Sequence, residues 1–255
     1  MLDLKALTVI TADEQTAGRG RGGRVWVSTG TDDVKMTFAF GLPASHVASA
    51  YLLSPLLSVA ALRALRRSAP GDSRMNAVGI KWPNDIVMGG ARKLGGILCE
   101  MESAVGGNFF VALGIGINVN STPEGLDVPR AQWPLTTLRT EVSGRGGYPL
   151  DIVAITNHLI DEFAAMVPLF TEQGWAPFRE EYALASVLLG HRIRFAVDAP
   201  GAAEKRTVTG IAESFADDGS LLVRDDKGDL LSFLAGEVAG IMLDKIGMIE
   251  GDAAF

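Results

Sequence analysis

Cysteine and histidine are scarce in this chain, and their scarcity excludes several kinds of site. The only cysteine is Cys99, which rules out an internal disulfide and a cysteine-rich zinc site. The three histidines, His46, His158 and His191, lie far apart and in no metal-ligand spacing. Catalysis is therefore left to lysine, arginine and carboxylates, and a divalent ion such as Mg²⁺ would have to arrive with a substrate. Cys99 lies in an apolar run, so we interpret it as a buried, inert thiol.

The chain also lacks an excess of basic residues and a long apolar run. Its net charge of -7 and pI of about 5.0 argue against a general nucleic-acid binder, which usually carries a basic face. Residues 1–5 lack the residue order of a signal peptide. The uncharged residues 47–62 are too short for a membrane span and contain Pro55. We therefore expect a cytoplasmic protein with no membrane partner.

What the chain does contain is an ordinary globular composition with one unusual segment, residues 13–28. Hydrophobic residues make up 47% of the 255 residues, enough for one large domain or a large domain with a small companion. Within the segment, glycines allow close backbone approach to a ligand, and they are Gly18, Gly20, Gly22 and Gly23. The arginines, which suit carboxylate and phosphate oxygens, are Arg19, Arg21 and Arg24. Trp26 adds a flat apolar surface. The pattern predicts an anion clamp, and a solvated surface loop is the alternative.

The first part of the chain predicts a sheet with one apolar helix. Runs of β-branched or alternating residues predict strands at 6–12, 34–40 and 109–119. Residues 45–67 predict a helix that Pro55 either kinks or divides, with Ser54 as the cap of a second segment. Residues 68–73 predict a loop. Residues 78–101 predict a hairpin with an outgoing arm over 78–82 and 86–88, a turn at 89–91 and a returning arm over 92–101.

The remaining sequence predicts two helices followed by a small β unit. Residues 120–148 are rich in Pro, Gly and Thr and predict a long surface connection. Asp151 caps an expected helix that reaches about residue 172, and a second helix is expected over 175–184. Short strands are expected at 191–197, 206–213, 220–225 and 230–234, as in a small barrel or sandwich. We place the boundary between the two units near Leu189.

Two glycines on the strand at 109–119 indicate a place where a ligand could lie against the sheet. Gly114 and Gly116 occupy alternate positions, so both leave bare backbone on the same face. Close packing of a neighbouring helix is the alternative explanation.

A second cluster of polar residues lies in the predicted hairpin. Residues 81–85 read Lys-Trp-Pro-Asn-Asp, and residues 92–97 read Arg-Lys-Leu-Gly-Gly-Ile on the returning arm. The hairpin brings Lys93 back beside Asn84 and Asp85. A cation between two anions at an effective dielectric near 20 contributes about 4 kcal/mol to each contact, enough to help a carboxylate meet the α-phosphate of ATP. Asp85 could hold Mg²⁺, orient Lys93 or form a plain ion pair, and the alternative for the whole cluster is solvated charge around a turn.

Four ordered segments resemble the catalytic core of biotin protein ligases. They are residues 15–26, residues 81–85, residues 92–97 and the Gly-Ile-Gly-Ile-Asn run at 114–118. The C-terminal part, around 175–178, 190–193 and 210–212, is similar to the small SH3-like domain of that family. The resemblance implies an α+β fold, in which a mixed β-sheet with flanking helices at 1–189 precedes an SH3-like β-barrel at 190–255.

The resemblance also implies the reaction and the residues that carry it. Biotin and ATP would give biotinyl-5′-adenylate, which a lysine of a carboxylase carrier domain would attack. Lys93, Arg21 and Asp85 would be catalytic. The biotin site would be formed by Gln15, Gly18, Arg19, Gly20, Arg21, Lys93, Gly96 and Gly116. The ATP site would be formed by Arg24, Trp26, Asn84, Asp85 and Asn118.

One feature of the family has no counterpart in this sequence. Family members carry a strand and a Ser-Thr-Asn motif well before the glycine loop, and no Ser-Thr-Asn occurs here. We therefore expect an exposed sheet edge that could support a homodimer. Because the winged-helix segment of repressor-type members also has no counterpart, we expect no DNA binding. The other hypotheses are a ligase-like binding protein without turnover, a lipoate ligase-like enzyme and RNA binding through the arginine loop.

Overall fold

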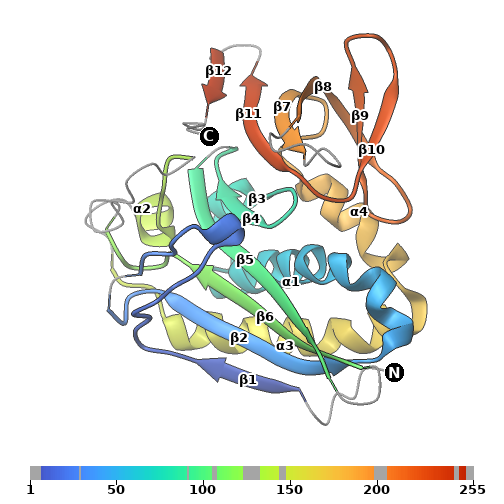
Figure 1. Ribbon diagram of the computed structural model, residues 1–255. Coiled ribbons are helices and arrows are strands. Elements are labelled where there is room, and N and C mark those ends of the chain that lie inside the picture. Colours follow the sequence, from blue (N-terminus) through green and yellow to red (C-terminus); the bar gives the residue numbers. More distant parts are fainter. Residues whose placement is uncertain are drawn as a thin grey trace.

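The computed structural model describes residues 7–28, 30–90, 92–104, 108–122, 133–143, 148–197, 206–243 and 247–250. Two six-stranded sheets and a layer of helices make up this part of the chain (Figure 1). The first sheet contains β1 (Thr8–Thr11), β2 (Val34–Leu42), β3 (Val78–Lys81), β4 (Asp85–Met88), β5 (Arg92–Ser103) and β6 (Phe109–Ile117). Its strand order is β1-β2-β6-β5-β4-β3, and each neighbouring pair is antiparallel.

The second sheet contains the C-terminal strands. They are β7 (Arg192–Val197), β8 (Arg206–Phe215), β9 (Leu221–Asp225), β10 (Leu230–Phe233), β11 (Glu237–Leu243) and β12 (Gly247–Glu250). The order is β10-β9-β8-β7-β11-β12, again with antiparallel neighbours. The first four strands were expected from the sequence, and the last two were not. Parallel pairing within the described ranges is limited to isolated bridges at Ile80–Ser186 and Lys93–Leu135.

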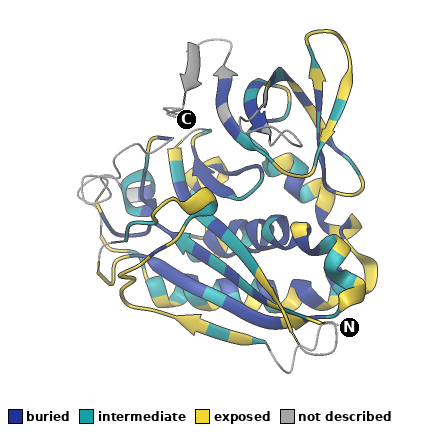
Figure 2. Cartoon of the chain, in the orientation of Figure 1, coloured by how far each residue is buried: buried dark blue, intermediate teal, exposed yellow. Residues whose placement is uncertain are grey.

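Helices cover one face of the first sheet. The α-helices are α1 (Leu53–Ser68), α2 (Leu138–Ser143), α3 (Ile152–Gln173) and α4 (Ala176–Ala185), and the 3₁₀ turns are η2 (Arg21–Gly23), η3 (Ala44–Leu52) and η4 (Ser73–Ala77). Helices α1 and α3 pack against each other and against the sheet (Figure 1). Because strand residues alternate between faces, Phe38 of β2 points into this layer, where its ring lies 4.4 Å from that of Phe163. The buried side chains of β2, α1 and α3 gather at this core (Figure 2).

Two of the helical stretches, Ala44–Ser68 and Ile152–Gln173, are long and apolar enough to cross a membrane by length and composition alone. In this fold both supply side chains to the core between the helices and the sheet, such as Leu56 and Phe163. Asp151 caps α3 as expected, since its carboxylate accepts a hydrogen bond of 3.0 Å from the Ala154 amide.

The expected helix over residues 45–67 is divided into two segments, which was one of the two expectations for Pro55. The predicted cap, however, was wrong. Leu52 is the N-cap residue and makes no side-chain capping bond, so Ser54 is not the cap. Pro55 lies in the first turn of α1, where its missing N–H removes no helical hydrogen bond. The preceding residues form η3, which packs against α1.

The interpretation of residues 78–101 as a simple hairpin was wrong. β3 and β4 pair with each other, with Lys81 opposite Asp85, and β4 then pairs with β5. The three strands therefore form a meander whose first turn contains the cis Trp82–Pro83 bond. The chain reverses at residues 82–84, in the middle of what was expected to be one outgoing arm.

Residues 120–148 are not all surface connection, as far as they are described. Trp133 and Thr137 are buried, and α2 occupies Leu138–Ser143. Residues 123–132 and 144–147 lie outside the described residues. The described part packs against the end of the first sheet, where it bears on the site below.

Candidate active site

The arginine-glycine segment folds into a tight hairpin on the open face of the first sheet. The amide of Gly20 donates to the carbonyl of Arg24 at 2.7 Å, and the amide of Trp26 donates to the carbonyl of Gly18 at 2.9 Å. Gly22 has a φ of 64°, in the left-handed region that glycine adopts without strain. A side chain on Gly18 would place its Cβ 2.2 Å from the Trp26 carbonyl oxygen. Glycine is therefore required where the hairpin closes.

A row of residues runs across the open face under this hairpin. Strand pairing places Lys35 opposite Gly116, Gly116 opposite Gly96, Gly96 opposite Asp85, and Asp85 opposite Lys81. The row therefore has charged side chains at both ends and bare backbone in the middle. Such an arrangement lets a flat group approach the sheet while charged groups flank it.

The indole of Trp26 lies in the hollow that the two glycines leave. A Cβ on Gly116 would sit 2.6 Å from ring carbons of Trp26, and one on Gly96 would sit 3.3 Å from the ring. The Lys93 ammonium lies 5.6 Å from the ring centroid, within the range of a cation–π contact. The hairpin and the polar cluster of the meander thus meet at one place, as the sequence predicted.

Asp85 holds two lysines at the edge of this hollow. Its Oδ1 lies 2.7 Å from the Lys93 ammonium and its Oδ2 lies 2.7 Å from the Lys81 ammonium. Burial opposes ionisation of this carboxyl, but the charges of both lysines outweigh it and hold the pKa of Asp85 well below its ordinary value. Lys81 is itself buried and lies 5.0 Å from the Trp133 ring centroid. Asp85 is therefore an ionised acceptor that orients Lys93.

A β-bulge directs Lys93 to the open face. Ile86 pairs with Gly95 but the next residue, Val87, pairs with Lys93, so Leu94 is an extra residue in β5. Without that extra residue the alternation of side chains would have placed Lys93 on the helix-covered face. The bulge brings it onto the same face as Gly96 and Asp85.

The segment around Pro134 fixes the backbone of Lys93. The Lys93 amide donates to the Pro134 carbonyl at 2.7 Å, and the Thr136 amide donates to the Lys93 carbonyl at 3.0 Å. The Asn118 side-chain amide donates in turn to the Thr136 carbonyl at 3.1 Å. Asn118 is only 3% exposed, so its buried side chain supports the polar cluster indirectly, by holding the segment that binds the Lys93 backbone. Sequence reasoning missed this segment because its Pro and Thr content is typical of loops.

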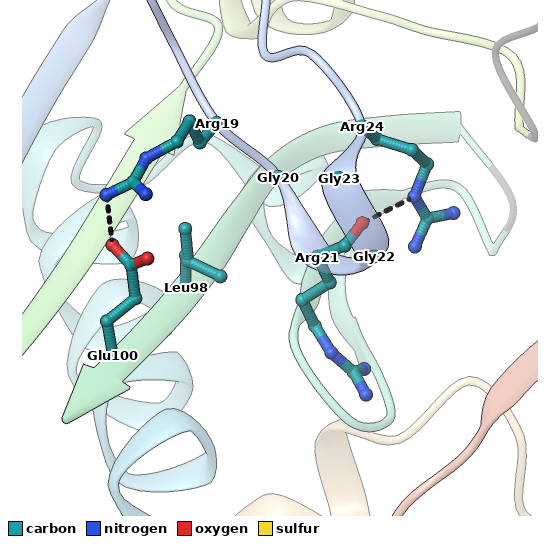
Figure 3. A pocket seen from close by; sticks show the side chains of 8 residues that line it. All are labelled: Arg19, Gly20, Arg21, Gly22, Gly23, Arg24, Leu98 and Glu100. Atoms are coloured by element: carbon teal, nitrogen blue, oxygen red, sulfur yellow. Dashed lines mark hydrogen bonds and ion pairs between the residues drawn. The ribbon is translucent and has the colours of Figure 1, made fainter. Parts of the chain in front are cut away.

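Arg21 and Arg24 connect the hairpin to the rest of the site. Arg21 donates to Asn84 Oδ1 at 3.1 Å and to the Gly236 carbonyl at 3.5 Å. Arg24 donates through Nε to the Arg21 carbonyl at 3.0 Å (Figure 3). It also forms an ion pair with Glu237. Asn84 donates to the Ile97 carbonyl at 2.8 Å, which fixes its oxygen toward Arg21. The second sheet therefore meets the hairpin at Gly236 and Glu237, which the sequence did not indicate.

Arg19 points to the opposite side of the hairpin from Arg21 (Figure 3). It forms an ion pair of 2.8 Å with Glu100 of β5. A pocket of about 290 Å³ lies between the hairpin and β5. Residues 19–24 of the hairpin line one wall, and Leu98 and Glu100 of β5 line the other. Gln15 is exposed near Gly18, at the start of the hairpin. The three arginines thus face different surroundings.

Cys99 is half-buried on β5, and burial raises the pKa of its thiol to about 11. The thiol is protonated at neutral pH, as the interpretation of an inert cysteine requires. Among the described residues no group of three or more His, Cys, Asp or Glu side chains could hold a metal ion.

Comparison with known proteins identifies the family of the chain. Residues 1–120 match the biotin/lipoate A/B protein ligase family. Over 229 residues the chain is 32% identical to the biotin–acetyl-CoA-carboxylase ligase of Paracoccus denitrificans, which covers 86% of this chain and 85% of that protein. The chain belongs to the biotin protein ligase family.

Other biotin protein ligases show the same relationship. The biotin–acetyl-CoA-carboxylase ligase of Mycobacterium tuberculosis is 32% identical over 236 residues, covering 90% of this chain and 77% of that protein. The bifunctional ligase/repressor BirA of Bacillus subtilis is 31% identical, and the chain spans 62% of its length. The solved structure of the Aquifex aeolicus biotin protein ligase in complex with biotin and ATP has a TM-score of 0.67 and 23% identity, covering 90% and 87% of the two chains. That likeness shows that the fold is shared.

Proposed function

We propose that this chain is an ATP-dependent biotin protein ligase that makes biotinyl-5′-adenylate and transfers biotin to a lysine of a carboxylase carrier domain. In the first step a biotin carboxylate oxygen forms a bond to the α-phosphorus of ATP and pyrophosphate leaves. In the second step the lysine amine attacks the biotinyl carbonyl and AMP leaves. The observation that carries the proposal is Lys93 held by Asp85 beside the glycine hollow, in a chain of this family.

Lys93 is proposed to bridge the biotin carboxylate and the α-phosphate. Both groups are negatively charged, so a cation between them lowers the cost of bringing them together. Asp85 fixes the direction of the ammonium, and the bulge and the Pro134 segment fix its backbone. The chain supplies position and charge, with no covalent enzyme intermediate.

The remaining assignments follow the resemblance to biotin protein ligases. Gln15, Gly18, Arg19, Gly20 and Arg21 are proposed to line the biotin site together with Gly96 and Gly116. Arg24, Trp26 and Asn84 are proposed to serve the nucleotide. Asn118 is buried and holds Thr136, so its proposed contribution to the ATP site is indirect. Arg21 is proposed to act on the reacting groups because it already reaches Asn84 beside Asp85.

Mg²⁺ is proposed to enter the site with ATP. The oxygens of Asp85 are both engaged by ammonium groups, which compete with a metal ion for the same lone pairs. At sites that bind nucleotides, phosphate oxygens are usual ligands of Mg²⁺, and the ion keeps several of its own water ligands. When bound, the ion would neutralise the charge of the departing pyrophosphate.

The domain boundary, the oligomeric state and the location are further parts of the proposal. We infer a catalytic domain at 1–189 and an SH3-like barrel at 190–255, because the second sheet begins with β7 at Arg192. The exposed edge of β1 is proposed as a homodimer contact. The acidic net charge of -7 supports a protein that does not bind DNA, and we propose a cytoplasmic location.

The first experiment measures adenylate formation. Wild-type protein is mixed with biotin and MgATP, and pyrophosphate release and biotinyl-5′-adenylate are followed. Lys93→Ala should abolish both while the unfolding midpoint stays close to that of the wild type. Lys227→Ala is the matched control, since Lys227 is an exposed lysine in the turn between β9 and β10. Full activity of Lys93→Ala would refute the assigned role of Lys93.

The same assay separates the alternatives. A wild-type chain that binds nucleotide but releases no pyrophosphate is a binding protein without turnover, and calorimetric titration with biotin, alone and with a non-hydrolysable ATP analogue, would then show which half of the site works. Preferential adenylation of lipoate in competition would make it lipoate ligase-like. Retention of single-stranded RNA at low salt would support the RNA-binding hypothesis.

A further inference from the structure

Lys35 is a buried lysine on the site face of β2, and its ammonium is used entirely on backbone carbonyls. Lys35 is only 6% exposed to solvent. Its Nζ donates to the carbonyls of Asp13, Gly30 and Asp33 at 3.0, 2.6 and 3.1 Å. An ammonium has three N–H groups, so these three acceptors satisfy it completely.

Burying an ammonium costs several kcal/mol unless hydrogen bonds replace its water. The neighbouring carboxylate, Asp33, directs its Oδ1 to the Val119 amide at 2.7 Å and to the Ser121 hydroxyl at 2.8 Å. Lys35 is therefore held by carbonyls from three places in the chain and not by a hydrogen-bonded carboxylate.

Asp13 precedes the arginine hairpin in the chain, and Gly30 follows it. Lys35 therefore ties the outgoing chain after β1 to the incoming chain before β2. The backbone repeats the tie, since the Ala12 amide donates to the Lys35 carbonyl at 3.1 Å. Everything between the two tied points, including Arg21, Arg24 and Trp26, belongs to one closed loop.

The position of Lys35 also relates it to the glycine hollow. Lys35 pairs directly with Gly116, and Gly116 is the residue over which the Trp26 ring lies. The point at which the loop is tied and the point at which its indole docks are thus neighbours on the sheet. Fixing the base of the loop limits the positions from which Trp26 can reach the hollow.

We propose that Lys35 is a positioning residue that clasps the base of the arginine loop and so pre-organises its docking over the substrate site. The ammonium has no N–H left for a ligand, so Lys35 acts through the loop. Without the clasp the loop would have to be ordered again each time a substrate binds, so losing the clasp should weaken binding more than it slows the chemical step. This proposal rests on the proposed ligase function for its kinetic readout, but not for its structural one.

The test compares Lys35→Met, Lys35→Gln and Lys227→Met with the wild type. Methionine keeps length and removes all three donors, glutamine keeps an amide that can reach part of the acceptors, and Lys227 is an exposed turn residue. Amide hydrogen exchange is measured for residues 12–30 and, as an internal reference, for β6. Adenylate formation is measured over a range of biotin and of ATP concentrations.

We expect exchange in residues 12–30 to accelerate about tenfold or more in Lys35→Met, less in Lys35→Gln and not in Lys227→Met, with β6 unchanged. The KM values should rise in the same order, while kcat stays within about threefold. Unchanged exchange and KM in both variants would overturn the proposal, and so would a fall in kcat alone, which would place Lys35 in the chemical step.

If Lys35→Met accelerates exchange throughout the chain, the milder Lys35→Gln decides by the same criteria. If Lys35→Gln also loosens β6, Lys35 supports the whole fold and the proposal is overturned. If the wild type forms no adenylate, the proposed ligase function fails, but the exchange of residues 12–30 against β6 still decides whether Lys35 clasps the loop.

Discussion

At the scale of single residues, Asp85 arranges the charges of the site. Its two oxygens each accept from a different lysine, one buried and one facing the hollow. Because Lys81 balances the charge of the carboxylate, the cluster keeps the positive charge of Lys93 for a substrate. The pairing of Lys93 with Asp85 follows from the sequence motifs. The pairing of Asp85 with the buried Lys81 could not be predicted, because it depends on β3 and β4 lying next to each other.

Asp85→Asn should lower the free energy of unfolding by about 3–5 kcal/mol at pH 7, because Lys81 would remain buried without its counter-charge. The pKa of Asp85 is lower in the folded chain than in the unfolded one, where it is about 3.9. Its stabilising effect is therefore complete above that value and is lost as the pH falls through the folded pKa.

Urea unfolding of both proteins at pH 7 and at pH 3 measures this effect. The difference between wild type and Asp85→Asn should shrink at the lower pH. A difference that is the same at both values would show that ionised Asp85 does not contribute as described.

The glycine hollow allows a sharper comparison of two neighbouring positions. Gly116→Ala would put a methyl group 2.6 Å from the Trp26 ring, whereas Gly114→Ala meets its nearest atom at an ordinary 3.6 Å. Overpacking of 1–3 kcal/mol at Gly116 would displace the indole and reduce kcat/KM for adenylation by about tenfold or more. Steady-state kinetics of both variants check this, and equal losses at both positions would contradict it.

At the scale of elements, an irregularity in β5 decides which face carries Lys93. Regular alternation from Gly96 would have turned this lysine toward the helices, and the extra residue Leu94 turns it to the open face. A bulge of this kind needs a partner for the displaced backbone. The segment from Pro134 to Thr136 supplies it through its two hydrogen bonds to Lys93.

Thr136→Pro should reduce kcat of adenylation by about tenfold or more, because it removes the N–H that holds the Lys93 carbonyl, and small displacements of a catalytic group are costly. Thr136→Val is the matched control. It keeps the backbone bond and removes only the hydroxyl contact to Glu141 at 2.6 Å. Single-turnover kinetics distinguish the two, and equal activity of both variants would argue against the role of this segment.

Most elements could be predicted because their side chains follow a clear period. β2 alternates around Met36 and Phe38, and α3 has both a cap at Asp151 and an apolar stripe. The turn at Pro83 was missed because the strand-like runs 78–82 and 86–88 were read as two parts of one arm, across the polar residues Asn84 and Asp85. The clasp of Lys35 could not be predicted, since its acceptors are backbone carbonyls that carry no sequence signal.

At the scale of the whole molecule, the second sheet takes part in the site through residues 236–237. Gly236 lies against the buried ring of Trp82, where an added Cβ would come within 3.3 Å of that ring. Glu237 follows directly and pairs with Arg24 of the hairpin. The position of the hairpin therefore depends on the packing of one sheet against the other.

Glu237→Gln should raise KM for ATP by no more than about fivefold, because a partly exposed ion pair contributes about 0.2–1 kcal/mol. The effect should diminish in high salt, which already screens the pair in the wild type. Kinetics at low and high ionic strength measure both expectations. A loss of activity that is independent of salt would indicate that Glu237 acts by something other than charge.

The docking of Trp26 has an optical consequence. The chain contains four tryptophans, and Trp82, Trp133 and Trp175 are 2–4% exposed in the core. Trp26 alone of the four lies beside the Lys93 ammonium, on the bare backbone of the site. A molecule that enters the hollow changes the surroundings of this indole directly, whereas the other three are enclosed in the core. The protein thus carries its own fluorescent indicator of occupancy, without a label.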